Sequence, residues 1–397
     1  MRPAGSQDFA KWVGNTGDIR EGGGGCDMLE RYGHGGDLVT AADEYGLSED
    51  GFLDFSSNMN PYGPPESVGR LLCGRWRELA RYPDPAIRSF RRKLAERFRI
   101  DAERIWVGNG AAELIDLAVR AIMPRTAAVV RPSFSEYEEA VTKAGGRVIE
   151  IPLSAADRFD LPERDVRRVA ARTDVLIVGH PNNPTGRPAD PRFLRDLARD
   201  GVRLIVDEAF IDFSPEQERL SLIRLAAESD RVAVIRSMTK FYAVPGIRLG
   251  FVVAGGEWIA RIRRLQVPWS VNAPAQWIGE ALLDEREYAE RTVRWIGEER
   301  AWLSGKLASL GLTVTPSEAN FLLCRLPSAN GGSIGPLDAG TVQRLLGRRG
   351  VLIRDASRFP GLDGSYIRVA VRLRHENERL VSELARVFAR AADGRPE

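Results

Sequence analysis

The chain has 397 residues, of which 43% are hydrophobic, and its 57 basic and 55 acidic residues leave a formal net charge of +2. This length allows a large buried core, while the balanced charge gives no single-sign field of the kind that nucleic acid or an anionic membrane requires. Three widely spaced cysteines argue against a disulfide framework, three histidines argue against a metal site, and no run of about 18 apolar residues suggests a membrane span. We therefore expect a cytoplasmic globular protein that binds no metal ion, nucleic acid or membrane.

The N-terminal region divides into two parts by composition. Residues 1–27 are polar and contain the run Gly22–Gly25, so this segment buries little surface and is predicted to be a flexible tail. Met28 follows directly, and the abrupt change in composition leads to the hypothesis that the protein starts there. We assign residues 28–76 to an N-terminal arm and to part of a smaller domain.

Short apolar runs alternate with helical periodicity over residues 77–284, which we assign to a large domain. The runs are typical of buried strands, which we expect at Ile105–Gly108, Ala127–Arg131, Val148–Pro152, Val175–Gly179, Leu204–Asp207, Val232–Arg236 and Leu249–Ala254. Helices are expected between them at Ala111–Met123, Phe134–Ala144 and Pro191–Arg199. This alternation predicts an α/β domain with a mostly parallel sheet, in which ligands bind beyond the carboxyl ends of the strands.

A smaller α+β domain is expected over residues 285–397. A long charged helix at Asp284–Leu310 leads into it. Strands are expected at Thr313–Val314, Asn320–Arg325, Val351–Arg354 and Tyr366–Val371, and helices near Thr341–Arg349 and His375–Ala391. The segment Ser328–Asp338 is rich in glycine, serine and proline, which predicts an exposed loop.

Three motifs lie at carboxyl ends of the predicted strands. Gly110, in the run Gly108–Glu113, precedes a helix, and small residues there let a phosphate approach the backbone amides of the helix N-terminus. Asn183, in the run His180–Gly186, lies in a rigid turn that can aim an amide at a ligand oxygen. Asp207 ends a strand, where a carboxylate can keep a pyridinium nitrogen protonated. Each motif alone also has an ordinary structural interpretation, as a turn or a helix cap.

Lys240 is the most informative single residue. It follows the predicted strand Val232–Arg236, with the Ser237 hydroxyl three residues before it and Arg248 eight residues after it. A lysine amine in this setting can bind an aldehyde cofactor covalently while its neighbours hold a phosphate, which points to pyridoxal phosphate. Phe134 follows an earlier strand and can stack on such a cofactor, although a core aromatic residue would also fit that position.

The order Asn183–Gly186, Asp207, Ser237, Lys240 and Arg248 resembles the fold type I pyridoxal-phosphate enzymes of the aspartate aminotransferase superfamily. The resemblance covers about residues 28–391 and implies a large domain with a mostly parallel sheet between helices, a smaller α+β domain, and a homodimer with shared active sites. By this resemblance, Lys240 binds the cofactor aldehyde, Asp207 its ring nitrogen and Asn183 its ring oxygen. The other implied cofactor ligands are Gly110, Ala111, Ala112, Ser237 and Arg248 for the phosphate, Phe134 for the ring, and Tyr82 from the neighbouring subunit.

Two branches of this superfamily compete for the substrate assignment. The sequence around Asn60 is similar to both histidinol-phosphate aminotransferases and threonine-phosphate decarboxylases. The run Tyr32–Asp37 resembles the decarboxylases, as does Phe210, where many relatives carry a tyrosine whose hydroxyl contacts the cofactor. The implied substrate ligands are His34, Gly36, Asn60 and Asn183, with Arg368 on the carboxylate and Arg354, beside His34, on the phosphate.

The resemblance to the decarboxylases implies that L-threonine O-3-phosphate loses carbon dioxide to give (R)-1-amino-2-propanol O-2-phosphate for cobalamin synthesis, with Lys240 and Asp207 as catalytic residues. The bond at the α-carbon that is held perpendicular to the cofactor ring breaks, so positioning decides between decarboxylation and transamination. Three alternatives stay open: a histidinol-phosphate aminotransferase, a decarboxylase of serine phosphate or of a phosphonate, and a regulator or binding protein with the same fold. Residues 1–27 argue against the regulator, because they are too short and glycine-rich for a helix-turn-helix domain.

Overall fold

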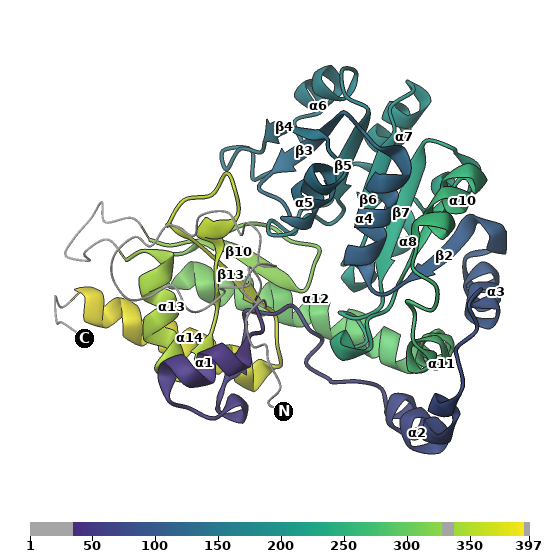
Figure 1. Cartoon of the computed structure of the whole chain (residues 1–397). Coiled ribbons are helices and arrows are strands. Elements are labelled where there is room, and N and C mark those ends of the chain that lie inside the picture. The colour runs from purple at the N-terminus through teal and green to yellow at the C-terminus, as the bar shows by residue number, and fades with distance from the viewer. Residues whose placement is uncertain (1–34, 328–336, 393–397) are drawn as a thin grey trace, which may run out of the picture.

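The computed structural model describes residues 35–327 and 337–392. The chain forms a larger part and a smaller part that lie side by side, at the right and left of Figure 1 respectively. Helix α12 (Arg286–Ser309) runs from the larger part into the smaller one. The tail predicted at residues 1–27 and most of the loop predicted at Ser328–Asp338 lie outside the described residues.

A seven-stranded sheet forms the centre of the larger part, in the order β2-β8-β7-β6-β5-β3-β4. Strand β8 is antiparallel to both of its neighbours and the other pairs are parallel, which confirms the predicted mostly parallel sheet. The strands are β2 (Ile105–Gly108), β3 (Thr126–Arg131), β4 (Arg147–Pro152), β5 (Val175–Gly179), β6 (Leu204–Asp207), β7 (Val232–Ser237) and β8 (Gly250–Ala254).

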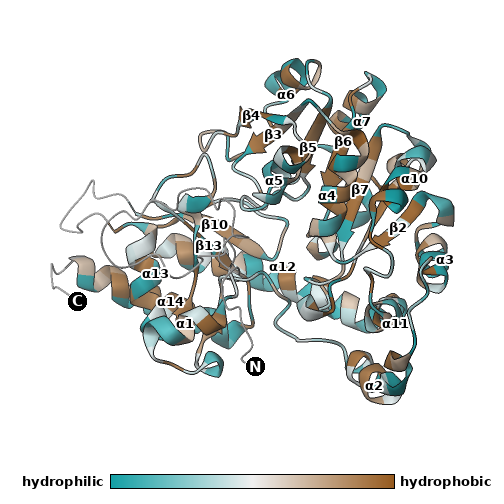
Figure 2. Cartoon of the chain, viewed as in Figure 1, coloured by the Kyte–Doolittle hydropathy of each residue, from teal (hydrophilic) through white to brown (hydrophobic). Residues whose placement is uncertain are grey.

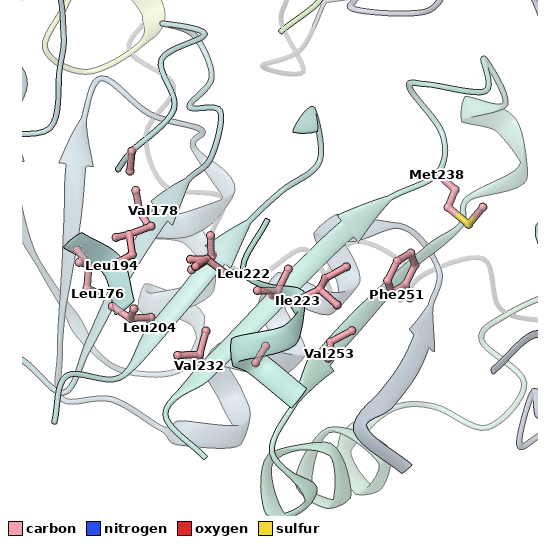
Figure 3. Close-up of a cluster of buried hydrophobic side chains, with 14 of the residues drawn as sticks. Leu176, Val178, Leu194, Leu204, Leu222, Ile223, Val232, Met238, Phe251 and Val253 are labelled. Atoms are coloured by element: carbon pink, nitrogen blue, oxygen red, sulfur yellow. The ribbon is translucent and has the colours of Figure 1, made fainter. Parts of the chain in front are cut away.

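The central strands form because helices bury both of their faces. In β5, Leu176 and Val178 pack into one hydrophobic cluster, which contains Leu194 of α7, whereas Val175 and Ile177 pack into another, which contains residues of α4, α5 and α10. Figure 3 shows side chains of the first cluster, and Figure 2 shows the brown strands enclosed by helices whose outer faces are teal. Each fully buried leucine or valine stabilises the fold by about 1.5–3 kcal/mol, so this packing holds the carboxyl ends of the strands in place.

The larger part also contains helices and short helical turns, most of which cover the sheet, whereas α2 packs on α11 away from it (Figure 1). They are α2 (Glu66–Arg75), α3 (Arg88–Phe98), α4 (Ala111–Ile122), α5 (Glu136–Lys143), α6 (Glu163–Ala170), α7 (Pro191–Arg199), α8 (Gln217–Leu220), α9 (Ile223–Glu228), α10 (Gly256–Leu265) and α11 (Ala273–Leu282). Within residues 35–327 and 337–392, no helix combines the length and the apolar character needed to cross a membrane.

The smaller part contains an antiparallel sheet of order β12-β13-β10-β9 and a parallel pair, β1 with β11. Its strands are β1 (Leu53–Asp54), β9 (Thr313–Val314), β10 (Phe321–Arg325), β11 (Val351–Leu352), β12 (Arg354–Asp355) and β13 (Tyr366–Ala370). Its helices besides α12 are α1 (Leu38–Tyr45), α13 (Ala339–Gly347) and α14 (Arg374–Ala392). The pairing of β1 with β11 ties the N-terminal segment to the C-terminal part of the chain.

The strand predicted at Val351–Arg354 is interrupted at Ile353. Strand β11 pairs with β1 on one side of this point, whereas β12 pairs with β13 on the other, so the chain changes partners within four residues. Ile353 is buried in the core of the smaller part. The sequence does not indicate this change of partner, because the residues before and after Ile353 each fit the pattern of a strand.

Candidate active site

A cavity of about 570 Å³ lies where the larger and smaller parts meet. Four of the residues that line it, Ser133, Pro181, Asp207 and Ser237, stand at or just after the carboxyl ends of β3, β5, β6 and β7. Arg368 of β13 lines it from the smaller part. Parallel α/β sheets bind ligands at this edge, and the volume suits a small organic molecule, so the cavity is the candidate site.

Lys240 lines this cavity from the loop that follows β7. Burial, together with the positive charges of Arg368 and Arg248, lowers the pKa of the Lys240 amine to about 8. More of this amine is neutral at physiological pH than for an exposed lysine, and the neutral form is the nucleophile. The structure therefore presents Lys240 in a setting that favours a covalent bond to a carbonyl group.

Asp207 lines the cavity at the end of β6, and both of its carboxylate oxygens are held. The Tyr137 hydroxyl donates a hydrogen bond to Oδ2 at 2.8 Å, and the backbone N–H of Ala209 donates to Oδ1 at 3.0 Å. Burial raises the pKa of Asp207 to about 6, and these two hydrogen bonds oppose that rise by favouring the ionised form. Asp207 can therefore present a fixed negative charge to a ligand in the cavity at neutral pH.

Replacing Tyr137 with phenylalanine is expected to shift the acidic limb of the kcat/KM profile to higher pH by about one unit. The substitution removes the hydrogen bond that favours the Asp207 carboxylate, so the pKa of Asp207 rises, and a higher pH is then needed to ionise it. The measurement is a pH profile of kcat/KM for both proteins. An acidic limb at the same pH in both would contradict this role for the tyrosine.

The N-terminus of α4 forms a second region of the cavity. Ala111 and Ala112 line the cavity there, and the first amides of a helix have no partner within it. Gly110 precedes them with φ +89°, and a Cβ at this position would lie 2.5 Å from Arg248 Nη2. The positive φ favours glycine at this position, and the missing side chain lets the Arg248 guanidinium approach the backbone. Ser237 also lines the cavity, so amides, a guanidinium and a hydroxyl are close enough together to bind an anion such as a phosphate.

Phe134 and Asn183 line the cavity as well, and both contact other site residues. The Phe134 ring lies edge-on to Tyr137, with 5.8 Å between the ring centroids and an interplanar angle of 84°. The Asn183 Oδ1 accepts a hydrogen bond of 2.7 Å from Arg368 Nη1. Asn183 therefore links the turn after β5 to the arginine on β13.

Arg354 and Arg368 stand directly opposite each other on the antiparallel strands β12 and β13, and both line the cavity. Their exposed fractions are 5% and 6%. Arg368 also donates from Nη2 to the Ser56 carbonyl at 2.6 Å. Like charges that face each other across a strand pair are destabilising, so two buried arginines in this register favour the binding of anionic groups.

Four other residues were predicted as ligands, namely His34, Gly36, Tyr82 and Asn60, and the three of them that the structure describes do not line the cavity of their own chain. His34 lies outside the described residues, whereas Gly36 donates its N–H to the Ser56 hydroxyl at 2.9 Å and adjoins Gly35 of the cavity wall. Tyr82 is 83% exposed and its ring centroid lies 4.8 Å from that of Trp269, away from the cavity of its own chain. An exposed tyrosine is compatible with the predicted contact to a neighbouring subunit.

Asn60, the fourth of these residues, is not among the described residues that line the cavity. Its backbone N–H donates to the Lys240 carbonyl at 3.2 Å, and its side-chain amide donates to the Phe241 carbonyl and to the Thr292 hydroxyl, both at 2.9 Å. These bonds connect the loop of Lys240 to α12. Asn60 therefore holds the backbone of the Lys240 loop in place through hydrogen bonds. Its predicted contact with substrate stays a prediction.

Sequence reasoning missed several residues of the cavity wall. Among them are Asn58, Ser133, Tyr137, Thr239, Arg358 and Phe359. Tyr137 occupies an apolar position of a predicted helix, where a core residue is the simplest interpretation, and its partner Asp207 lies 70 residues further along the chain. Thr239 stands between Ser237 and Lys240, two residues that were assigned to the site, and this position was a signal in the sequence. In the structure its hydroxyl lies 2.9 Å from that of Ser237.

The residues that line the cavity match the groups of pyridoxal phosphate. The cofactor requires a phosphate site, a reactive amine, an acid for the ring nitrogen and an aromatic contact, and the residues described above supply all four. The buried side-chain oxygens of Ser133 and Asn58, which both line the cavity, have no hydrogen-bond partner within residues 35–327 and 337–392. Buried polar atoms are normally satisfied, so these two indicate a polar ligand. The residues fit the cofactor.

Known proteins of similar sequence agree with this geometry. The model of the family described as aminotransferase class I and II matches residues 50–384. A threonine-phosphate decarboxylase of Salmonella typhimurium is 38% identical over 361 residues, which cover 89% of this chain and 96% of that protein.

Two solved structures are also similar. The histidinol-phosphate aminotransferase of Clostridium acetobutylicum has a TM-score of 0.78 and 29% identity, and the match covers 85% of this chain and 99% of that one. The L-threonine-O-3-phosphate decarboxylase of Porphyromonas gingivalis has a TM-score of 0.75 and 25% identity, with 84% and 99% covered. The sequence match over most of the chain, the shared fold and the residues of the cavity lead to one conclusion: this chain belongs to the class I and II aminotransferase family.

Proposed function

We propose that the protein is a pyridoxal-phosphate-dependent decarboxylase that converts L-threonine O-3-phosphate to (R)-1-amino-2-propanol O-2-phosphate and carbon dioxide, as a step of cobalamin biosynthesis. The observation that carries the proposal is the opposed pair Arg354 and Arg368, buried on the cavity wall that also contains Lys240. The proposed substrate has two anionic groups, a carboxylate and a phosphate, and each can take one guanidinium. The 38% identity to the Salmonella typhimurium decarboxylase supports this choice.

When bound, pyridoxal phosphate withdraws electrons from the α-carbon of the amino acid attached to it, which weakens the bonds at that carbon. The chain provides the groups that hold it in place. Asp207 offers its charge to the ring nitrogen, and the Phe134 ring offers a flat apolar surface. The remaining ligands are Ala111, Ala112, Ser237 and Arg248 for the phosphate and Asn183 for the ring oxygen.

The Lys240 amine has two tasks in this proposal. Its neutral Nζ would hold the cofactor by the aldehyde group, and the same amine lies where it could deliver a proton to the α-carbon of the substrate. A pKa near 8 suits both tasks, because the amine exchanges a proton readily at neutral pH. Arg368 orients the carboxylate, and the orientation selects the bond that breaks.

Phe210 lines the cavity close to these groups, and its ring packs edge-on to Phe321 with 5.0 Å between the centroids. Phenylalanine offers no hydroxyl to the cofactor, in contrast to the tyrosine of many relatives. This supports a chemistry that differs from common transamination, since a lost hydrogen bond to the cofactor oxygen changes its proton affinity.

The direct test incubates the protein and pyridoxal phosphate with L-threonine O-3-phosphate, without any keto acid, and follows carbon dioxide and the amine phosphate by mass spectrometry. Formation of both supports the proposal. The second candidate is a histidinol-phosphate aminotransferase, which the solved Clostridium acetobutylicum structure favours. Turnover of histidinol phosphate with 2-oxoglutarate, and none of threonine phosphate, would establish that candidate instead.

The substitution Arg354→Ala is expected to lower kcat/KM for L-threonine O-3-phosphate by about 10²-fold, because a buried charge-assisted contact to the phosphate is lost. Binding of L-threonine, which lacks the phosphate, should change by less than about threefold, since it makes no such contact. Steady-state kinetics and competition with L-threonine measure the two effects. Equal losses for both ligands would contradict the phosphate role of Arg354.

The active form is proposed to be a homodimer whose two subunits share active sites. Large apolar side chains are exposed together with Tyr82, namely Trp76, Leu79, Val267 and Trp269. Exposed apolar groups on this scale are typical of an interface between subunits. Light scattering on the purified protein is expected to give twice the mass of the 397-residue chain, and a monomer at working concentrations would contradict the shared site. The cytoplasmic location stays a prediction.

A further inference from the structure

Phe359 contacts both opposed arginines of the cavity. The Arg354 guanidinium carbon lies 5.6 Å from the centroid of its ring, and the Arg368 guanidinium carbon lies 5.8 Å from the same centroid. The ring is 7% exposed and lines the cavity. The face of an aromatic ring attracts cations, so a single side chain partly offsets the repulsion between two like charges placed opposite each other.

The position of this ring is set by the segment around it. The backbone N–H of Phe359 donates to the Ala356 carbonyl at 3.1 Å, and its carbonyl accepts from the Leu362 N–H at 3.0 Å. Phe359 belongs to the hydrophobic core of the larger part, although it follows directly after the strands of the smaller part. At Gly361, with φ +95°, a Cβ would lie 3.4 Å from Cβ of Arg131 at the end of β3. The segment is therefore anchored to the larger part, and the ring is anchored with it.

We propose that Phe359 is a specificity-determining positioning residue, which fixes the spacing of the Arg354 and Arg368 guanidinium groups and so selects ligands whose carboxylate and phosphate are joined through two carbon atoms. The inference rests on the proposed function, which supplies these two anionic groups. The strand register brings the two arginines together, and hydrogen bonds to Asn183 and Ser56 hold the Arg368 guanidinium. The Phe359 ring, which lies against both guanidinium groups, restricts where the Arg354 side chain ends relative to Arg368. A ligand with one anionic group needs one arginine and does not depend on the spacing.

The test uses two probes without an amine, which bind without reacting with the cofactor. The first, 3-phosphonooxypropanoate, has the carboxylate, the phosphate and the two-carbon spacing, whereas ethyl phosphate has the phosphate alone. Calorimetry on the holoenzyme gives both affinities for the native protein and for Phe359→Leu, which keeps an apolar side chain but loses the ring. We expect the substitution to weaken the binding of 3-phosphonooxypropanoate by about tenfold and the binding of ethyl phosphate by less than about threefold.

Two further variants separate positioning from general packing. Phe359→Tyr keeps the ring and is expected to keep the preference for 3-phosphonooxypropanoate. Leu362→Ala perturbs the packing of the same segment, since Leu362 packs against the same core, and is also expected to keep the preference. Equal losses for both probes in Phe359→Leu, or a loss of preference in Leu362→Ala, would overturn the inference.

Because neither probe turns over, the result does not depend on the reaction. A native protein that fails to decarboxylate threonine phosphate refutes the proposed function. A Phe359→Leu protein with an unchanged probe preference refutes only the role of the ring.

Discussion

Replacing Lys240 with alanine is expected to abolish turnover, with a fall in kcat on the order of 10⁴ or more. The substitution removes both the covalent anchor of the cofactor and the group that carries a proton to the α-carbon. The other groups of the cavity remain, so some binding of pyridoxal phosphate persists. Steady-state kinetics measure the loss, and equilibrium dialysis measures the cofactor that remains bound.

Borohydride reduction gives this prediction a second readout. In the native protein, mass spectrometry of a digest should find the cofactor attached to the peptide that contains Lys240, and the variant should carry none. The thermal unfolding midpoint of the cofactor-free proteins should be similar, since Lys240 lies on a cavity wall and not in the core. Near-normal turnover by the variant would remove the assignment of Lys240.

The substitution Asp207→Asn is expected to lower kcat/KM by about 10²–10³-fold. Asparagine keeps the size of the side chain and can still accept the hydrogen bond from the Ala209 N–H, but it has no negative charge. The charge is what stabilises a protonated ring nitrogen, so the cofactor becomes a weaker electron acceptor. Turnover and cofactor affinity are measured side by side, and the expected loss is mainly in kcat.

A matched control for this substitution is Asp116→Asn on α4. Asp116 forms a partly exposed ion pair with Arg120 at 3.4 Å, outside the cavity, and such pairs contribute about 0–1 kcal/mol to stability. The control is expected to retain full activity. An Asp207→Asn enzyme that works as well as this control would contradict the role of the Asp207 charge.

Most strands of the larger part could be predicted from the sequence because they are buried on both faces, whereas the edge strand β4 is largely exposed. The ends of Ile105–Gly108, Val175–Gly179 and Leu204–Asp207 agree residue for residue with β2, β5 and β6. A strand buried on both faces, whether parallel like β5 and β6 or antiparallel like β2, is a short apolar run that stands out from its polar flanks. The residues at the carboxyl ends of these strands were therefore placed in the site from sequence alone.

Helices outside this alternation were harder to predict. Helix α10 begins at Gly256, directly after Gly255, and two glycines are typical of a turn. Helix α11 carries clearer signals, because the Asn272 side chain accepts a hydrogen bond from the Ala275 N–H and a proline follows in the first turn. Its apolar face packs against α2 and α3, contacts that depend on the tertiary structure.

The wall contributed by the smaller part depends even more on three-dimensional structure. Arg354 lies opposite Arg368 because the chain changes its pairing partner at Ile353. Phe359 lies beside both arginines because its ring is buried in the core of the larger part. Neither the change of strand partner nor the packing of Phe359 is indicated by a local sequence pattern. Sequence could name the two arginines through a resemblance, but not the ring that lies against both of them.

The measurement that tests the central proposal most directly uses L-threonine O-3-phosphate labelled with ¹³C in its carboxylate. The labelled substrate is incubated with the holoenzyme and 2-oxoglutarate, and ¹³C NMR follows the label, with Lys240→Ala as the control. We predict that the label leaves as carbon dioxide and bicarbonate in the native enzyme and stays in the substrate in the variant. A label retained in a phosphorylated keto acid would mean that the enzyme transaminates this substrate, and would contradict the decarboxylase proposal.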